Sequence, residues 1–321
     1  MNIVNATKTN ISLAAKIIKS GGLVAFPTET VYGLGADGLN PIAVAKIFEV
    51  KKRPQFNPLI LHISDLKMLY KITNYNSKLI DRLIKEFWPG PLTLVLPKKD
   101  IVPNIVTAGN PTVAIRMPDH KVALELIKKS GVPIAAPSAN VFSKLSPTTA
   151  QHVENQLGEK VNLILDGGKC RVGVESTIIK IDNKGVELLR PGGIPIEEIE
   201  IYTGKLKRRT TSNKPAAPGQ LPYHYAPSIP IAFLSRNSIF KNKKKKVGAI
   251  FFSEKKINYE FASVKILSEK KDLREAAANL FQYLHELENQ KLDIILVEKV
   301  QEKGLGLAIM DRLKKAIRKY K

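Results

Sequence analysis

Hydrophobic and polar positions change in short blocks along residues 1–205. Apolar residues at helical spacing predict helices at residues 10–19, 41–50, 77–87, 119–129 and 149–157, the first of them capped by Asn10. Short apolar runs between them predict strands at residues 23–26, 59–63, 93–96, 112–117, 134–136, 163–165, 176–181 and 186–189. This alternation indicates an α/β domain with a substantial sheet, although the pattern does not give the strand order.

Residues 205–225 interrupt this pattern. They mix basic residues, Thr, Ser and prolines without hydrophobic periodicity, so we expect an extended, mobile connection. The pattern then resumes, and it predicts strands at residues 229–234, 247–252, 264–267 and 294–297 and helices at residues 272–288 and 307–319, with the lysine run 243–246 in a solvated loop. The chain therefore divides into a domain at residues 1–205, a linker at 206–228 and a smaller α/β domain at 229–321.

The composition is that of a globular protein. Of the 321 residues, 44% are hydrophobic and 25% are charged, and no apolar run approaches the roughly 20 residues that cross a bilayer. Lys16 and Lys19 interrupt the apolar N-terminal stretch, which argues against a signal peptide. The single cysteine, Cys170, excludes an internal disulfide framework and fits a reducing compartment. We therefore expect a cytoplasmic location and no membrane partner.

The net charge of +22 favours anionic partners. Nucleotide phosphates, tRNA and acidic protein surfaces all belong to this class. A lysine-rich solvated surface gives the same total, so charge alone does not choose between these interpretations.

Several common catalytic fingerprints are missing from the sequence. It contains no G-x-x-x-x-G-K-[ST] loop, no G-x-G-x-x-G after a predicted strand and no G-x-S-x-G turn, and its five histidines lack zinc-type spacing. These absences disfavour a nucleophilic triad and zinc catalysis. Any chemistry then depends on positioning and electrostatics rather than on a covalent enzyme intermediate.

Two segments combine a buried strand with groups that suit a ligand pocket. Residues 26–35 (FPTETVYGLG) end a strand in hydroxyls, a carboxylate and glycines, which suits a pocket rim and equally a tight strand-to-helix turn. Residues 51–62 (KKRPQFNPLILH) place three cations before a strand, where they can meet a polyphosphate. A solvated helix end is the alternative for these cations, and a half-buried structural histidine is the alternative for His62.

Two further strand ends carry polar groups. In residues 113–118 (VAIRMP), Arg116 lies inside an apolar strand and needs either a substrate carboxylate or a structural Asp or Glu, because burying an unpaired guanidinium is costly. In residues 135–140 (AAPSAN), Ser138 and Asn140 are two positions apart and can face one side of an extended segment. A plain Asx or Ser turn is equally natural there.

The order of these motifs resembles that of the YrdC-type L-threonylcarbamoyladenylate synthase family. The motifs are PTETVYGLG (27–35), KKRP and NPLILHI (51–63), TVAIRMP (112–118), APSAN (136–140), ESTII (175–179) and LLRPG (188–192). The long form of that family adds a linker with a Pro-Gly…His-Tyr-Ala-Pro signature and a C-terminal α/β domain, and PGQLPYHYAP (218–227) matches the signature. The resemblance therefore covers essentially the whole chain.

This resemblance implies a fold and a reaction. The implied fold is α/β, with a twisted mixed sheet, a concave basic cavity and a smaller Rossmann-like α/β domain at the C-terminal end. The implied activity is that of a nucleotidyltransferase that condenses L-threonine, bicarbonate and ATP to threonylcarbamoyl-AMP and pyrophosphate. The product serves the N6-threonylcarbamoyladenosine modification of ANN-decoding tRNAs.

The resemblance also implies roles for individual residues. The implied catalytic set is Lys51, Arg53, Ser138 and Asn140. The implied ATP-binding set is Arg53, Asn57, Thr112, Ser138, Ser146, Arg190 and Tyr225, with Tyr225 closing over the nucleotide as part of a lid. The implied threonine-binding set, in which Arg116 clamps the carboxylate, is Thr30, His62, Arg116, Ala136 and Ser176.

The implied cofactor is Mg²⁺ that enters with ATP, without metal ligands assigned among the side chains. Besides ATP, L-threonine and bicarbonate, the implied partners are tRNA and a threonylcarbamoyl transferase complex that accepts the product. Two alternatives remain. The charge fits a non-enzymatic double-stranded RNA- or tRNA-binding protein, and related folds occur in hydrogenase-maturation proteins that use carbamoyl-phosphate, although their zinc-finger cysteine pairs are absent here.

Overall fold

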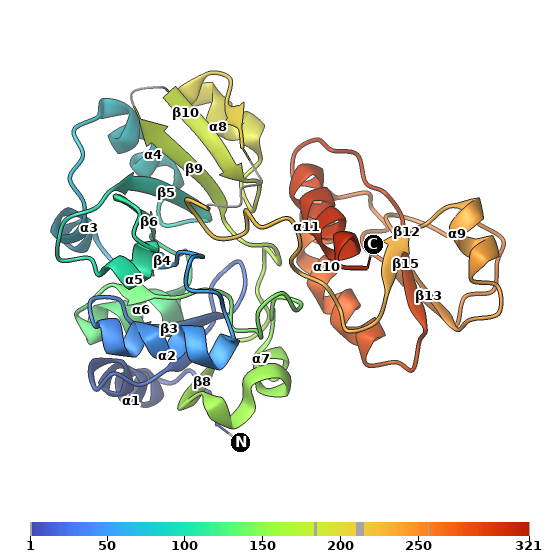
Figure 1. The fold of residues 1–321 in the computed structure, drawn as a ribbon, viewed down its shortest axis with the longest axis horizontal. Helices are drawn as coiled ribbons and strands as arrows, with labels where there is room; N and C mark the ends of the chain where they lie inside the picture. The colour runs from blue at the N-terminus through green and yellow to red at the C-terminus, as the bar shows by residue number, and fades with distance from the viewer. Residues whose placement is uncertain (1, 183–184, 210–214, 256, 321) are drawn as a thin grey trace.

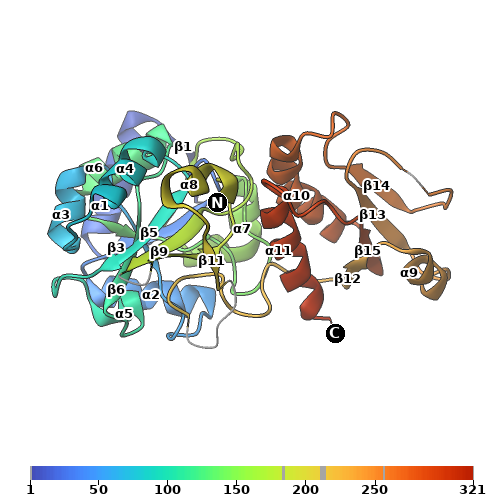
Figure 2. The same cartoon turned by 90° about the horizontal axis from the view of Figure 1, so that it is seen from above.

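Two sheets organise the residues that the computed structural model describes, which are 2–182, 185–209, 215–255 and 257–320. The strand order is β1-β8-β2-β3-β7-β4-β6-β5-β9-β10-β11 in the larger sheet and β12-β15-β13-β14 in the smaller. The larger sheet mixes parallel and antiparallel pairs, whereas the smaller is parallel. Figure 1 shows them in separate lobes, with helices α10 and α11 between them, and Figure 2 shows the same arrangement from above. The predicted α/β class with a mixed sheet and a second, smaller domain is confirmed.

The larger lobe contains the elements up to β11. Its strands are β1 (Ile3–Asn5), β2 (Val24–Phe26), β3 (Gly33–Asp37), β4 (Ile60–His62), β5 (Leu92–Pro97), β6 (Thr112–Arg116), β7 (Ile134–Ala135), β8 (Leu163–Asp166), β9 (Thr177–Asp182), β10 (Gly185–Arg190) and β11 (Lys207–Arg208). Its helices are α1 (Lys8–Lys19), α2 (Pro41–Lys51), α3 (Leu66–Ile72), α4 (Lys78–Phe87), α5 (Asn104–Thr107), α6 (Lys121–Ser130), α7 (Ala150–Leu157), the 3₁₀ turn η1 (Gly158–Lys160) and α8 (Ile196–Thr203).

The smaller lobe contains the remaining elements. Its strands are β12 (Ile231–Phe233), β13 (Val247–Phe251), β14 (Ser263–Ile266) and β15 (Ile294–Val297). Its helices are α9 (Arg236–Lys241), α10 (Leu273–Glu288) and α11 (Gly306–Arg318). The lysine run 243–246 follows α9 and is exposed, as predicted. No helix in the described part of the chain is long and apolar enough to span a bilayer.

Capping residues set where several helices begin. The prediction that Asn10 caps the first helix is wrong, because Thr7 accepts a hydrogen bond from Asn10 N (3.2 Å) and starts α1 three residues earlier. The side chain of Asn40 caps α2 by accepting hydrogen bonds from Ile42 N and Ala43 N, and Pro41 occupies the first helical position. Asp272 caps α10 in the same way.

Glycines explain why the sequence pattern did not reveal β3. Gly33 and Gly35 lie in this strand, antiparallel to β2, where residues 26–35 had suggested a rim or a turn. A Cβ atom on Gly35 would lie 2.7 Å from Cε1 of the Phe26 ring, so the close packing of the ring requires a residue without a side chain. The sequence pattern also did not predict several short elements, because each contains too few residues to show a clear hydrophobic periodicity. They are β1, α3, α5, α8, α9 and β11.

The linker packs against the larger lobe instead of running free in this structure. Strand β11 pairs with β10, so the larger sheet continues past the predicted boundary at residue 205. Residues 210–214 of the predicted linker lie outside the described residues. Farther along, Ala217, Gln220 and Tyr225 are buried. The predicted mobility of the linker stays a prediction.

Candidate active site

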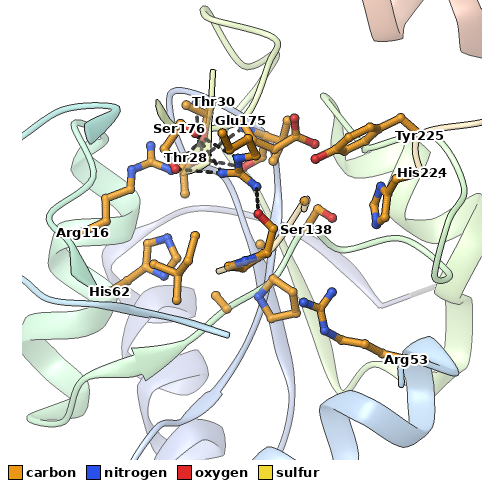
Figure 3. A pocket seen from close by; sticks show the side chains of 18 residues that line it. Thr28, Thr30, Arg53, His62, Arg116, Ser138, Glu175, Ser176, His224 and Tyr225 are labelled. Atoms are coloured by element: carbon orange, nitrogen blue, oxygen red, sulfur yellow. Dashed lines mark hydrogen bonds between the residues drawn. The ribbon is translucent and has the colours of Figure 1, made fainter. Parts of the chain in front are cut away.

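A pocket lies where strand ends of the larger lobe meet the linker. Parallel pairing of β4 with β6 places His62 opposite Arg116 at the carboxyl ends of the two strands. Figure 3 shows these side chains on one side of the pocket and Tyr225 and His224 on the other, with Arg53 below them. The lining residues are Thr28, Thr30, Val31, Gly33, Arg53, Ile60, His62, Arg116, Ala136, Pro137, Ser138, Glu175, Ser176, Arg190, Pro218, Gly219, His224 and Tyr225.

Arg116 is held in a fixed orientation beside the pocket. Its Nη2 forms an ion pair with Glu29 Oε2 (2.6 Å), its Nη1 donates to Thr30 Oγ1 (2.9 Å) and its Nε donates to Gly90 O (3.3 Å). Both partners of the ion pair are buried. A guanidinium carries five N–H donors in a planar fork, so the remaining donors are available to a substrate carboxylate. Both alternatives for Arg116 are thus compatible, because it has a structural carboxylate and also lines the pocket.

His62 is a neutral neighbour of this guanidinium. Burial lowers the pKa of its imidazole to about 3, and the positive charge of Arg116 contributes in the same direction. Its Nδ1 has no hydrogen-bond partner among the described residues. A buried nitrogen without a partner is costly, so it is a candidate contact for a bound ligand.

Arg190 connects Ser176 with the linker. Its Nε and Nη2 donate to Ser176 O (3.1 and 2.9 Å), and Nη2 also donates to Ser176 Oγ (3.0 Å). Its Nη1 donates to Pro218 O (3.5 Å). Ser176 Oγ is in turn 2.7 Å from Thr93 Oγ1 on β5. The guanidinium therefore lies where a rearrangement of the linker changes its surroundings.

Arg53 supplies a second guanidinium to the same pocket. It donates to Asn57 O (3.1 Å) and Pro58 O (2.8 Å). Burial lowers its pKa to about 9, and the nearby Arg190 adds to the decrease. Arg53 and Arg190 thus place two buried cations in one pocket, which favours an anionic ligand.

The linker closes the pocket with Gly219, His224 and Tyr225. Gly219 adopts a left-handed backbone (φ +86°), and a Cβ atom there would lie 2.6 Å from Arg190 Cδ and 2.8 Å from Tyr225 Oη. The His224 and Tyr225 rings are in contact, with centroids 4.1 Å apart. The remaining cavity measures about 50 Å³, far below the roughly 300 Å³ of a small ligand pocket. A nucleotide therefore needs the linker to move.

Glu175 is a buried carboxylate in the pocket wall. Its Oε1 accepts from Ser146 Oγ (2.5 Å), and its Oε2 accepts from Arg312 Nε (2.7 Å). Burial alone would raise the pKa of Glu175. The charges of Arg312 and Arg190 outweigh this effect and lower the pKa to about 2. Glu175 is therefore an anion whose neutralising partner comes from the smaller lobe.

Comparisons with known proteins match both lobes. Residues 16–192 match the Sua5/YciO/YrdC family model described as "Telomere recombination", and residues 194–317 match the model "Threonylcarbamoyl-AMP synthase, C-terminal domain". The Threonylcarbamoyl-AMP synthase of Pyrococcus abyssi is 46% identical over 95% of this chain and 93% of its own length. The chain belongs to the threonylcarbamoyl-AMP synthase family.

Two further relatives agree with this membership. The Threonylcarbamoyl-AMP synthase of Bacillus subtilis is 43% identical over 98% of this chain and 96% of its own length. The crystal structure of P. abyssi Sua5 complexed with L-threonine superposes with a TM-score of 0.92 at 44% identity, covering 99% of this chain and 98% of that one. The family resemblance inferred from the motifs is confirmed, and an enzyme of the nucleotidyltransferase type replaces the non-enzymatic RNA-binding alternative.

The pocket brings together most of the residues that the sequence suggested. Those that line it are Thr30, Arg53, His62, Arg116, Ala136, Ser138, Ser176, Arg190 and Tyr225. The lining does not include Lys51, Asn57, Thr112, Ser146 or Asn140. The substrate contacts of both sets stay predictions.

Lys51 lies behind the pocket wall. Its ammonium donates to Ser138 O (2.6 Å) and to the backbone and side-chain oxygens of Asn140. It is 1% exposed, and burial lowers its pKa well below the usual value. Ser138 Oγ donates to Asn140 Oδ1 (2.5 Å). In this structure Lys51 and Asn140 therefore shape the segment that carries Ser138.

The other residues outside the lining differ in their surroundings. Asn57 is fully buried, and its side-chain nitrogen and oxygen have no hydrogen-bond partner among the described residues, so a bound ligand could satisfy them. Ser146 reaches the pocket indirectly through Glu175. Thr112 is half-buried at the start of β6, opposite Pro97.

No site role was predicted for Glu29, Glu175 or His224, although each lies inside a motif that resembles the family. The sequence did contain a sign of the two carboxylates, since an acidic residue in a strand-end motif of a basic chain needs a cation as its partner. The motif alone does not identify which cation that is. Arg312, the partner of Glu175, is 137 positions away in sequence.

Proposed function

We propose that this chain condenses L-threonine, bicarbonate and ATP into threonylcarbamoyl-AMP and pyrophosphate, using the pocket beside β4, β6 and the linker. The observation that carries the proposal is the convergence of Arg53, Arg116 and Arg190 on one closed pocket. Fixed guanidinium groups suit substrates that carry a carboxylate and a triphosphate. Membership of the synthase family supplies the reaction type.

Arg116 would bind the threonine carboxylate. Glu29 and Thr30 fix its orientation, so little conformational freedom is lost when the substrate binds. His62 stays neutral at physiological pH because of its low pKa of about 3, so it can accept a hydrogen bond at the nitrogen that lacks a partner. The relative crystallised with L-threonine supports the amino-acid assignment.

Arg53 and Arg190 would face the phosphates of ATP. Lys51 would support them indirectly, by holding the Ser138–Asn140 segment through its carbonyl oxygens. Asn57, whose amide lacks partners, and Ser146, which Glu175 orients, would complete the nucleotide set. Tyr225 would pack over the nucleotide once the linker has closed.

The chemistry needs alignment rather than an enzyme nucleophile. The amine of threonine forms a C–N bond with the carbon of bicarbonate, and water leaves, which gives an N-carboxylate. One oxygen of that carboxylate then attacks the α-phosphorus of ATP, and the bond to pyrophosphate breaks. Guanidinium groups fixed beside the leaving group stabilise the charge that develops there, and a closed linker keeps water from the carbamate and the adenylate.

Mg²⁺ would arrive with the nucleotide. The carboxylates nearest the pocket are already engaged, Glu29 by Arg116 and Glu175 by Arg312 and Ser146. No cluster of three potential metal-binding side chains occurs among the described residues. Mg²⁺ commonly binds through substrate phosphates and water, which is the mode proposed for it in this pocket.

We further propose that the reaction takes place in the cytoplasm and that the product passes to a threonylcarbamoyl transferase complex acting on tRNA. The single cysteine is buried, which is compatible with a reducing compartment. The positive charge of the chain fits contact with tRNA.

A pyrophosphate-release assay with each amino acid, with and without bicarbonate, tests the proposed reaction. We expect release with ATP only when L-threonine and bicarbonate are both present. Salt-sensitive RNA binding without amino-acid-dependent release would favour an RNA-binding protein instead. Release supported by carbamoyl-phosphate, without bicarbonate, would favour the carbamoyl-phosphate transferase alternative.

A further inference from the structure

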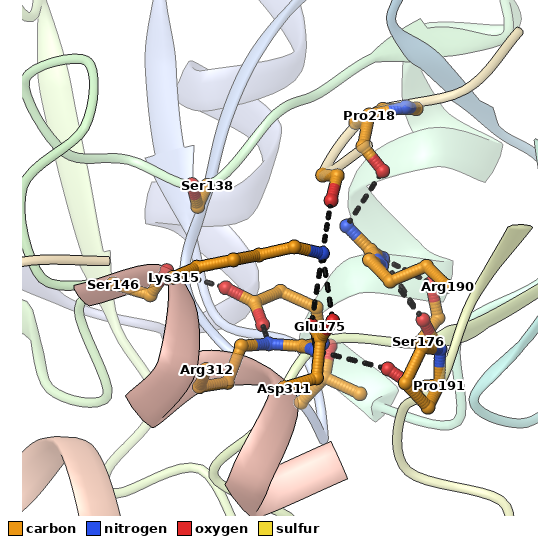
Figure 4. Close-up of polar contacts among 12 residues, drawn as sticks. Ser138, Ser146, Glu175, Ser176, Arg190, Pro191, Pro218, Asp311, Arg312 and Lys315 are labelled. Carbon is orange, nitrogen blue, oxygen red and sulfur yellow. Dashed lines mark hydrogen bonds and ion pairs between the residues drawn. The ribbon is translucent and has the colours of Figure 1, made fainter. Parts of the chain in front are cut away.

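Helix α11 of the smaller lobe directs two buried cations toward the pocket. Arg312 and Lys315 lie three positions apart on this helix, so they share one face. Both side chains are buried, since Arg312 is 1% exposed and Lys315 is 2% exposed. They belong to the smaller lobe, whereas the pocket wall belongs to the larger lobe. Figure 4 shows both side chains reaching from α11 toward Glu175, Pro191 and the linker.

The Arg312 guanidinium touches both the pocket wall and the lid. Its Nε donates to Glu175 Oε2 (2.7 Å), and its Nη1 donates to Pro191 O (3.0 Å) and to Asp311 Oδ2 (2.7 Å). The same guanidinium lies 4.8 Å from the centroid of the Tyr225 ring, which is within the range of a cation–π interaction. One side chain of the smaller lobe therefore contacts two lining residues, Glu175 of the larger lobe and Tyr225 of the linker.

Lys315 holds the linker at a second point. Its Nζ donates to Gly219 O (2.6 Å) and pairs with Asp311 Oδ1 (2.8 Å). The peptide of Gly219 lies against Arg190 and Tyr225. The face of α11 thus contacts the linker where the linker covers the pocket.

The charge of Glu175 makes the contact with Arg312 significant for the nucleotide. Glu175 lines the pocket and remains ionised, and a carboxylate there repels a triphosphate unless a cation neutralises it. Arg312 provides that cation from outside the lining, which leaves Arg53 and Arg190 free to attract the substrate. Glu175 also accepts from Ser146 Oγ and so fixes that hydroxyl.

We infer that Arg312 is a positioning residue for the ATP half of the reaction, acting through Glu175 and Tyr225, so that the smaller lobe completes the active site. This inference rests on the proposed function, because it assumes that the nucleotide occupies the pocket beside Glu175. Arg312 does not line the pocket, so it orients and neutralises groups that do.

The test combines two substitutions in the full-length chain. Arg312→Gln should raise the KM for ATP about tenfold or more, because it leaves Glu175 unpaired beside the phosphates. The KM for threonine should change by less than about threefold, because Arg116 has its own partner, Glu29. In the Glu175→Gln background, Arg312→Gln should add less than about threefold, since no charge is left to neutralise.

Two further variants separate positioning from folding. Arg312→Lys keeps the charge and should restore part of the ATP affinity while its thermal unfolding stays near that of the parent chain. Lys314→Gln is the matched control, because Lys314 lies on the same helix, is exposed and pairs only with exposed Glu302 in the described contacts. It should leave both KM values unchanged.

The outcomes distinguish this inference from the proposed function. If the parent chain makes threonylcarbamoyl-AMP but Arg312→Gln matches Lys314→Gln in the KM for ATP, the positioning role is wrong and the proposed function stands. If the effects of Arg312→Gln and Glu175→Gln simply multiply, Arg312 acts on the fold and not through Glu175. If the parent chain forms no product, the proposed function itself fails.

Discussion

Gly219 offers a sharp test of how the linker closes the pocket. Replacing it with alanine introduces two separable costs. The backbone at this position is left-handed (φ +86°), and an L-residue there costs about 1–2 kcal/mol. The added methyl group would also lie 2.6 Å from Arg190 Cδ and 2.8 Å from Tyr225 Oη, so at least one of these groups must shift.

Gly131 provides a matched control for the backbone cost. It is left-handed (φ +69°), but a Cβ atom built there meets nothing within 4 Å. Gly131→Ala should therefore lose stability without changing the pocket. Gly219→Ala carries an additional packing cost of about 1–3 kcal/mol, which opposes the closed linker. Because the linker must leave this packing to admit a nucleotide, this excess corresponds to a KM for ATP lowered by up to about 5- to 150-fold.

Steady-state kinetics and thermal unfolding of both variants measure the two costs separately. We expect both proteins to unfold at somewhat lower temperature than the parent chain, but only Gly219→Ala to change its KM for ATP, toward a lower value. If the two variants had the same KM for ATP, closure of the linker over Arg190 would not oppose nucleotide entry.

Three other predictions concern single charged groups. Arg53→Ala should lower threonine-dependent pyrophosphate release about a hundredfold, whereas Ala at the exposed neighbour Lys52 should have little effect; similar rates for both would refute a phosphate contact. Arg116→Lys keeps the charge but loses the planar fork, so the KM for threonine should rise about tenfold with little change for ATP, and an equal change for both substrates would contradict the carboxylate clamp. Glu175 has a folded pKa of about 2 against a usual value of 4.5, so its contribution, about 3 kcal/mol by linkage, is present above pH 4.5 and is lost as pH falls toward 2. Urea unfolding of the parent chain and of Glu175→Gln at a series of pH values checks this, because the stability difference between them should shrink with acid.

The pocket was largely predictable because its groups follow strand ends. Motifs such as residues 27–35 and 136–140 concentrate hydroxyls and small residues directly after an apolar run. A strand end is also where side chains from neighbouring strands meet, as His62 and Arg116 do. Local sequence therefore singled out Arg53, Arg116 and Ser138 as candidates, whereas Ser176 and Arg190 came only from the family resemblance.

Local sequence could not determine which way each cation points. Lys51, Lys52 and Arg53 are adjacent, yet Lys51 is buried behind the pocket wall, Lys52 is exposed and Arg53 lines the pocket. The left-handed backbone at Lys52 turns the chain at the end of α2 and separates the three side chains. This geometry depends on the helix end and not on residue type.

Contacts between the lobes were equally hidden. No site was predicted within residues 229–321, because in the sequence a buried arginine and lysine on an amphipathic helix look like ordinary surface cations. Only the packing of α11 against the larger lobe brings Arg312 to Glu175 and Lys315 to Gly219. Long-range pairing of this kind leaves no periodic signal in the sequence.

Transfer of label from ¹³C-bicarbonate tests the central claim most directly. The claim is that one pocket holds threonine, through Arg116, beside the phosphates of ATP. Mass spectrometry of the reaction should detect the labelled carbon in one product that contains both threonine and AMP, formed together with pyrophosphate, and Arg116→Lys should lower its yield at limiting threonine. Pyrophosphate and AMP formed without a labelled threonine adduct would contradict the account.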